Sequence, residues 1–189
     1  MALTYNTLGT VAPGDVLRAN SGTAAYNSLI TNVNNYRVPP MMRATRVAAQ
    51  SIANNANGAV RFDTQTFDTD GMFAPTSNVI TFPTAGIYLL TANMTWDGNA
   101  TGLRVVGIYH NPTISANTDA ATVTSGVRIA HVTNAAISGA ATNLFVATTY
   151  EFAANDTACM SCFQTSGGAL NTRTDDLPTF TATWLGQAT

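Results

Sequence analysis

Hydrophobic and polar positions alternate most clearly over residues 86–96, the longest apolar and β-prone stretch of the chain. The odd positions from 87 to 95 change from aliphatic residues to Thr and Asn, whereas the even positions are apolar throughout: Tyr88, Leu90, Ala92, Met94 and Trp96. Successive side chains of a strand point to opposite faces. The stretch therefore predicts a central strand with one buried face and one face that gradually reaches water.

From residue 43 onward, similar short apolar runs follow one another at fairly even spacing, with Gly, Pro, Asn and Asp clusters between them. This pattern is typical of an all-β sandwich or jelly roll. Strands are expected near residues 43–52, 59–67, 78–82, 86–97, 103–110, 123–133, 142–152, 157–164 and 179–186. Two of them have an apolar face of their own, formed by Leu144, Val146, Tyr150 and Phe152 and by Phe180, Ala182 and Trp184.

The first 40 residues differ from this pattern and predict a separate N-terminal attachment segment, so the domains are expected at 1–40 and 41–189. Ser21 is a plausible N-cap, Pro39 and Pro40 end the segment, and between them apolar residues recur at steps of three and four: Tyr26, Leu29, Ile30, Val33 and Tyr36. A helix this short is marginal alone in water. We expect its apolar stripe to pack on copies of itself or on another protein, the alternative being its own β domain.

Charged residues make up only 10% of the 189 residues against 46% hydrophobic, so Thr, Asn, Ser, Gly and Ala must cover much of the surface. Such a surface favours assembly. The net charge is −2 and the eight basic residues, all arginines, are scattered, which excludes a basic footprint for nucleic acid. The N-terminus lacks the charged start and apolar run of a signal peptide, and no stretch is long enough for membrane insertion; we expect synthesis in a cytoplasm.

Candidate chemistry is sparse, and no catalytic residue or enzyme activity is predicted. His110 and His131 lie in β-prone runs without a nucleophile motif, which favours packed or edge positions. Paired carboxylates could cleave sugars, but the acidic pairs Asp68/Asp70 and Asp175/Asp176 are typical of turns. Asp68-Thr69-Asp70-Gly71 has part of a calcium loop and lacks its remaining ligands.

Cys159 and Cys162 fall within one expected strand. Their odd spacing places the two side chains on opposite faces, where they are poorly placed to bridge each other. C-x-x-C spacing also occurs in redox motifs and zinc sites, but no second pair or nearby histidine accompanies it. Two reduced packing cysteines are the expected arrangement.

The segment Ile80-Thr81-Phe82-Pro83-Thr84-Ala85-Gly86-Ile87-Tyr88 resembles the central signature of C1q/TNF-like jelly rolls. Further stretches resemble that family in the same order, over roughly residues 42–187: Phe67–Phe73, Phe152–Ala158, Gln164–Gly168 and Phe180–Gly186. Two departures are visible, Asn155 in place of a glycine and Ala158 in place of a larger aliphatic residue. The resemblance implies a C1q/TNF-like jelly-roll sandwich.

The resemblance also implies a homotrimer, and some C1q-like trimers bind calcium, although no residue here predicts a metal or cofactor site. Aromatic side chains outside the sandwich core are then candidates for subunit contacts. Phe145 and Phe163 have the opposite parity to the expected core faces, so both are predicted at the trimer interface.

The opening phrase Pro13-Gly14-Asp15-Val16-Leu17-Arg18-Ala19-Asn20 resembles the first residues of many tailed-phage tail and fibre proteins. Together the two resemblances predict a non-enzymatic virion protein, assembled in the bacterial host cytoplasm and joined to other virion proteins through residues 1–40. Its trimeric knob is expected to bind host cell-surface carbohydrate through several weak sites. The alternative is a capsid decoration (cement) protein that stabilises the head.

Overall fold

The computed structural model describes residue 33 and residues 38–188, in a chain that divides into two compact units, Met1–Val38 and Pro39–Thr189. The predicted N-terminal helix lies outside the described residues except for Val33, which has helical conformation. Within the described residues there is no helix long and apolar enough to cross a membrane.

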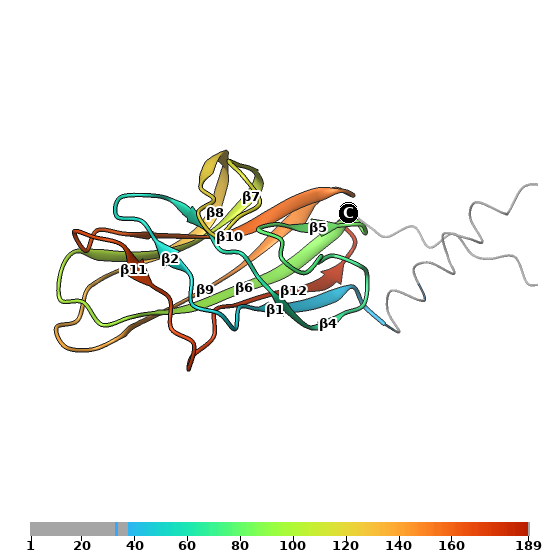
Figure 1. The fold of residues 1–189 in the computed structure, drawn as a ribbon. Coiled ribbons are helices and arrows are strands. Elements are labelled where there is room, and N and C mark those ends of the chain that lie inside the picture. Colours follow the sequence, from blue (N-terminus) through green and yellow to red (C-terminus); the bar gives the residue numbers. More distant parts are fainter. Residues whose placement is uncertain (1–32, 34–37, 189) are drawn as a thin grey trace, which may run out of the picture. The chain divides into compact units, whose positions relative to one another are not determined.

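The second unit is made of β-strands (Figure 1). The strands are β1 (Met41–Thr45), β2 (Ser51–Ile52), β3 (Gly58–Ala59), β4 (Thr64–Asp68), β5 (Ile80–Phe82), β6 (Gly86–Trp96), β7 (Leu103–Ile114), β8 (Val123–Ala135), β9 (Thr142–Phe152), β10 (Asp156–Gln164), β11 (Leu170–Asn171) and β12 (Thr179–Gly186). The expected all-β class is confirmed for this unit.

Ten of the twelve strands form two antiparallel sheets that face each other, and β2 and β11 pair with each other as a separate two-stranded sheet. The first, which we call the β6 sheet, has the order β4-β1-β12-β6-β9. The second, the β10 sheet, has the order β3-β10-β7-β8, and β5 also pairs with β10. Neighbours such as β12 and β6 are far apart in the sequence, as the crossing connections of a jelly roll require.

Strand β6 is the central strand that the alternation predicts. It pairs with β9 from Gly86↔Phe152 to Trp96↔Thr142, and with β12 on its other side. The five side chains predicted to point inward, Tyr88, Leu90, Ala92, Met94 and Trp96, are all 0% exposed. The prediction is therefore confirmed.

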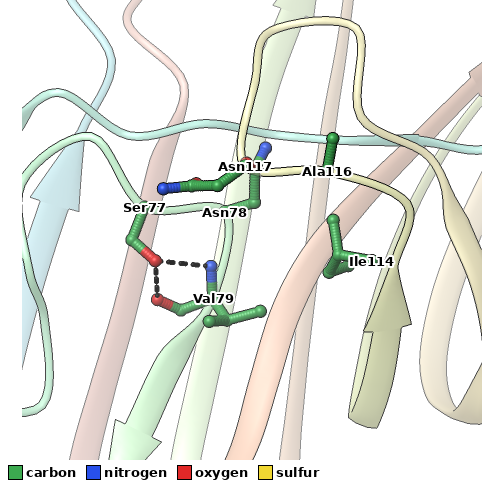
Figure 2. Close-up of a pocket in the computed structure, with 6 residues that line it drawn as sticks. All are labelled: Ser77, Asn78, Val79, Ile114, Ala116 and Asn117. Carbon is green, nitrogen blue, oxygen red and sulfur yellow. Dashed lines mark hydrogen bonds between the residues drawn. The ribbon is translucent and has the colours of Figure 1, made fainter.

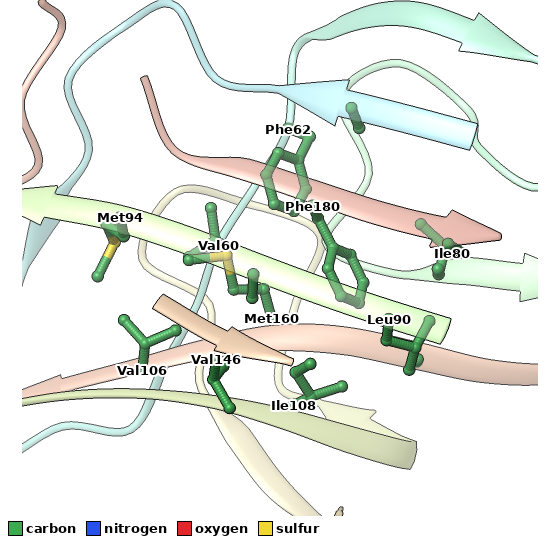
Figure 3. Packing of buried hydrophobic residues seen from close by; sticks show 14 of the residues in the cluster. Val60, Phe62, Ile80, Leu90, Met94, Val106, Ile108, Val146, Met160 and Phe180 are labelled. Atoms are coloured by element: carbon green, nitrogen blue, oxygen red, sulfur yellow. The ribbon is translucent and has the colours of Figure 1, made fainter. Parts of the chain in front are cut away.

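The core lies between the two sheets, where aliphatic, methionine and aromatic side chains interdigitate (Figure 3). The β6 sheet contributes Leu90, Met94, Val146 and Phe180, and the β10 sheet contributes Val106, Ile108 and Met160. The apolar faces predicted for residues 142–152 and 179–186 belong to this core, with Tyr150 partly buried at its margin. Removing this apolar surface from water is the main term that stabilises the sandwich.

An aromatic cluster closes the core at the corner between β5 and β6. The ring of Phe82 stacks on Phe152 with centroids 3.8 Å apart, and meets the edge of Tyr88 at 4.8 Å. The buried Tyr88 hydroxyl donates a hydrogen bond to the carbonyl of Thr84 at 2.7 Å, and burial raises the pKa of this phenol well above its usual value. The corner is thus fixed both by ring packing and by a satisfied buried hydroxyl.

The predicted strands over 43–52 and 59–67 are each divided in the structure. The first becomes β1 and β2, separated by residues 46–50, where the buried Arg46 side chain donates hydrogen bonds to the carbonyls of Ala48 and Arg61. The second becomes β3 and β4, which belong to different sheets. Two-residue strands such as β2 and β11 are too short to leave an alternation in the sequence.

Asn155 explains one departure from the C1q/TNF-like pattern. It lies in the turn between β9 and β10 with φ of 69°, a left-handed conformation that glycine adopts freely and asparagine tolerates. Ala158, at the second departure, is fully buried and paired with Ile80 and His110. Neither departure disturbs the strand pairing.

Candidate functional site

The outward face of the β6 sheet carries an apolar surface that the domain itself leaves uncovered. Side chains here point away from the core, because they alternate along a strand with buried residues or pair across the sheet with other residues that point outward. The large hydrophobic members are between 36% and 58% exposed, and we call them the outer apolar face: Phe67, Ile87, Leu89, Phe145 and Leu185. A patch of this kind marks a contact surface.

Polar residues without charge fill the middle of this face. Thr91 of β6 and Thr181 of β12 are cross-strand partners whose hydroxyl groups lie 2.5 Å apart, and Ala147 is the partner of Thr91 on β9. The charged side chains that strand pairing places on the face are Arg43 on β1 and Glu151 on β9. Arg43 is the cross-strand partner of Thr181, so a partner that covers the middle of the face must also pair the Arg43 guanidinium or leave it in water.

Towards the Trp96 end of β6 the outer face becomes a hydrogen-bonded polar cluster. The Asn143 side-chain amide donates to the Asn93 oxygen at 3.0 Å, the Thr95 hydroxyl at 2.6 Å and the Asp176 carboxylate at 2.9 Å. Thr95 also donates to the Asp176 carboxylate. Asp176, predicted in a turn, thus has a structural role.

Of the predicted interface residues, Phe145 lies on the outer apolar face. It is 58% exposed and its cross-strand partner is Asn93. Phe163 lies on β10, where it alternates with the buried Cys162 and Gln164, so it points outward from the opposite sheet; it is half-buried beside Val105. Both residues point away from the shared core as their parity predicts, but the structure does not bring them together on one surface.

The predicted attachment residues Tyr26, Leu29, Ile30 and Tyr36 lie outside the described residues, so their role stays a prediction. Val33 is the one member of that set that is described.

His110, for which the sequence predicts a packed or edge position, packs near the end of the core. Its Nε2 atom lies 2.9 Å from the Asp156 carboxylate, and the Tyr150 hydroxyl lies 3.3 Å from its Nδ1 atom. The Asn111 side chain and the Ala153 N–H also donate to Asp156. With both ring nitrogens engaged, His110 ties the β9–β10 turn to β7. His131 is exposed on β8.

The remaining acidic turn residues are also used locally. Asp68 accepts hydrogen bonds from the backbone N–H groups of Asp70, Met72 and Phe73, so it holds the turn that follows β4. Asp175 pairs with Arg173 on the surface. In the part of the chain that the structure describes, no three His, Cys, Asp or Glu side chains are grouped as a metal site.

Both cysteines are free and buried, on opposite faces of β10 as predicted. Cys162 belongs to the main core, and Cys159 packs in a smaller cluster with Ala59, Ala121 and Val123 on the other face. Burial raises the pKa of Cys159 to about 12 and that of Cys162 further still, so neither is a thiolate at neutral pH.

A pocket of about 310 Å³ lies between the segment that enters β5 and the β7–β8 loop (Figure 2). It is lined by Ser77, Asn78, Val79, Ile114, Ala116 and Asn117. Sequence reasoning missed it, because polar residues in two turns separated by about 35 positions resemble ordinary loop composition. Only a prediction of which turns meet could have found it.

The β7–β8 loop beside this pocket is held by an ion pair. The Arg46 guanidinium is 4% exposed and donates to both carboxylate oxygens of Asp119, at 2.9 and 2.8 Å. The Gln50 side chain adds a hydrogen bond to the Asp119 carbonyl at 2.8 Å. The loop is therefore fixed through side chains as well as through its own backbone.

No known protein family profile matches the sequence, and no curated protein matches it. Several solved structures are similar to the β domain. The globular domain of zebrafish complement 1qA protein has a TM-score of 0.55 at 10% identity, covering 79% of this chain and 99% of that one. Murine APRIL at pH 8.5 has a TM-score of 0.55 at 10% identity, with 77% and 98% covered. Eiger TNF from S. frugiperda has 0.53 at 12%, with 79% and 96% covered. The β domain therefore has the jelly-roll fold shared by C1q and TNF globular domains.

Proposed function

We propose that this protein is a non-enzymatic component of a tailed-phage virion. A homotrimer of its jelly-roll domain forms a knob, residues 1–40 join the knob to other virion proteins, and the knob binds carbohydrate on the host cell surface. The jelly-roll fold supports the binding-domain part of this proposal. The phage part rests on the resemblance of residues 13–20 to the opening of tail and fibre proteins.

The outer apolar face is the observation that carries the homotrimer. Five large hydrophobic side chains remain exposed on one face of one sheet, around a middle where Thr91, Thr181 and Ala147 lie. A cyclic trimer joins this face to a different surface of the next copy, so the contact is heterologous and closes after three subunits. The half-buried Phe163 on the opposite sheet is a candidate for that second surface.

Non-enzymatic binding agrees with the chemistry of the described residues. His110, Asp156 and Tyr150 are tied to one another, and the acidic residues of the turns hold backbone or basic groups. A knob with three copies of a weak site gains avidity from multivalency, which suits reversible adhesion to a repetitive glycan.

Sedimentation of the purified chain tests the trimer: the expected species has three times the 19.8 kDa monomer mass. A stable monomer at micromolar concentration would overturn it. Cryo-electron microscopy of the parent particle tests the location. A few knobs at the tail tip are expected, whereas many trimers at local threefold axes of the head would show the decoration role instead.

A further inference from the structure

The pocket between the β5 entry segment and the β7–β8 loop has a polar wall with one uncommon feature. The Asn78 side chain is only 2% exposed, and its Nδ2 group donates to the carbonyls of Ala59 at 3.0 Å and Thr118 at 3.2 Å. Its Oδ1 atom has no hydrogen-bond partner among the described residues. A buried acceptor without a partner costs about 1–3 kcal/mol, so the position calls for an explanation.

The orientation of this amide is determined by its partners. Rotating the Asn78 amide by 180° would place its oxygen against the two carbonyl oxygens of Ala59 and Thr118, which is repulsive. The Oδ1 atom is therefore held in place as an acceptor. A group that donates a hydrogen bond, such as a hydroxyl, would satisfy it.

The other lining residues combine polar and aliphatic surface. Ser77 is already occupied, because its hydroxyl donates to the Val79 carbonyl and accepts from the Val79 N–H (Figure 2). The exposed Asn117 amide makes no side-chain hydrogen bond to another described residue, so it can donate and accept. Val79 and Ile114 form an aliphatic wall that packs on the small cluster around Cys159.

The loop that forms the other side of the pocket is anchored at positions next to the lining residues. Asp119 is held by Arg46, and Thr118 is held through its carbonyl by Asn78. The Ala121 carbonyl accepts from the Ala59 N–H at 2.9 Å. Anchoring leaves the exposed residues Ala116 and Asn117 as the tip that can adjust.

We propose that this pocket binds one neutral sugar residue, and this inference deepens the proposed adhesive function on which it rests. No lining residue is charged, which disfavours an ionic ligand. A sugar ring offers hydroxyl groups for Asn78 and Asn117 and C–H surface for Val79 and Ile114. The volume of about 310 Å³ lies at the lower end for small-molecule pockets, which suits a single ring.

In this structure Asn78 Oδ1 is covered from solvent. A sugar hydroxyl therefore reaches it only when the atoms that cover it shift, and the affinity of one site is reduced by the free energy of that shift. A trimer carries three such sites, which compensates for the weakness of each.

The test is ligand-observed NMR on the full chain with methyl glycosides of glucose, galactose, mannose and N-acetylglucosamine. At least one is expected to bind with a dissociation constant of about 1 mM. Ala116→Trp fills the pocket from its exposed rim and should weaken binding about tenfold or more, whereas Ala120→Trp, on the same loop but outside the pocket, should leave it unchanged. Unfolding temperatures of all variants show that each is folded, and Asn117→Trp is a second blocking variant.

The inference is overturned if the wild type binds none of the four glycosides more tightly than about 10 mM, or if both blocking variants bind like wild type. A host-cell adhesion assay distinguishes the failure of the sugar site from the failure of the proposed function. Adhesion that survives Ala116→Trp overturns the pocket as the adhesive site and leaves the adhesive knob intact. Glycoside binding at the pocket without any cell adhesion overturns the function and leaves the sugar site.

Discussion

The indole of Trp184, near the end of β12, lies directly against the Cα atom of Gly86 at the start of β6. Its Nε1 group donates a hydrogen bond to the carbonyl of Ala85 at 3.2 Å. A Cβ atom at position 86 would overlap the indole and the carbonyl of Gly186. This contact joins the last strand to the corner that begins the central strand.

Gly86→Ala should therefore destabilise the domain by about 3 kcal/mol or more, because neither the indole nor the backbone can yield without disturbing the aromatic corner. Urea unfolding measures the change. Gly168→Ala is the matched control, since nothing lies within 4 Å of the added methyl group there. Equal stability of the two variants would contradict the packing described.

Phe145→Asp should convert the proposed trimer to a monomer without unfolding the domain, because it places a charge on the outer apolar face and leaves the core untouched. Sedimentation velocity and circular dichroism measure the two effects. Ile137→Asp is the control: it is 55% exposed, close to the 58% of Phe145, but lies in the β8–β9 loop. A variant that stays trimeric at Phe145 would exclude this face as the interface.

Asp119→Ala should cost about 2 kcal/mol, because it leaves the buried Arg46 guanidinium without its carboxylate and releases the β7–β8 loop. Thermal unfolding gives the stability change. Asp175→Ala removes the exposed partner of Arg173 and should change stability little, since surface ion pairs contribute little. If both substitutions had the same small effect, Arg46 would not depend on Asp119.

Asp156 should make the free energy of unfolding fall at acidic pH. Burial alone would raise the pKa of this carboxyl, but hydrogen bonds from Asn111, His110 and Ala153 outweigh it and hold the pKa below its usual value. A carboxyl whose pKa is lower in the folded state stabilises the fold above its unfolded pKa of about 3.9 and loses that contribution as pH falls through the folded value.

Asp156→Asn should therefore reduce stability by roughly 1 kcal/mol at pH 7 and flatten the fall in stability below about pH 4. Urea titrations at a series of pH values measure this. Asp97→Asn, which removes an acidic group from the loop after β6, is the variant with which the stability of Asp156→Asn is compared. An unchanged pH profile in Asp156→Asn would mean that the His110 cluster does not contribute to acid stability.

Cys159 and Cys162 should not react with a thiol reagent in the folded protein, because both are buried and their pKa values are raised. At pH 8 the native chain should release no chromophore from Ellman's reagent, and the denatured chain should show two thiols. Rapid reaction in the native state would show that β10 opens easily.

The alternation along β6, β9 and β12 made the core faces predictable, because each strand turns one face to the core and its side chains have a period of two. The same parity placed Phe145 and Phe163 outside the core. It could not show that they lie on opposite sheets, since strand order follows from pairing between distant segments. Phe163 needed the register of β10 against β7 before its surface could be identified.

Contacts between loops could not be predicted from the sequence for the same reason. The ion pair of Arg46 with Asp119 and the pairing of Asn78 with Thr118 join turns that are 40 or more positions apart. Each residue alone has the composition of a loop, and only the folded arrangement makes Arg46 buried and Asn78 an acceptor without a partner. Long-range polar contacts leave no periodic trace in a sequence.

The antiparallel pairing of β1 with β12, from Met41↔Thr183 to Thr45↔Thr179, brings the point where the chain enters the β domain beside the point where it leaves. The Trp184 N–H donates to the Pro40 carbonyl at 2.8 Å, so a segment fused behind β12 would begin close to the start of β1. The connection between β8 and β9 is the better place to insert a reporter peptide, because Gly139 there has open space around it.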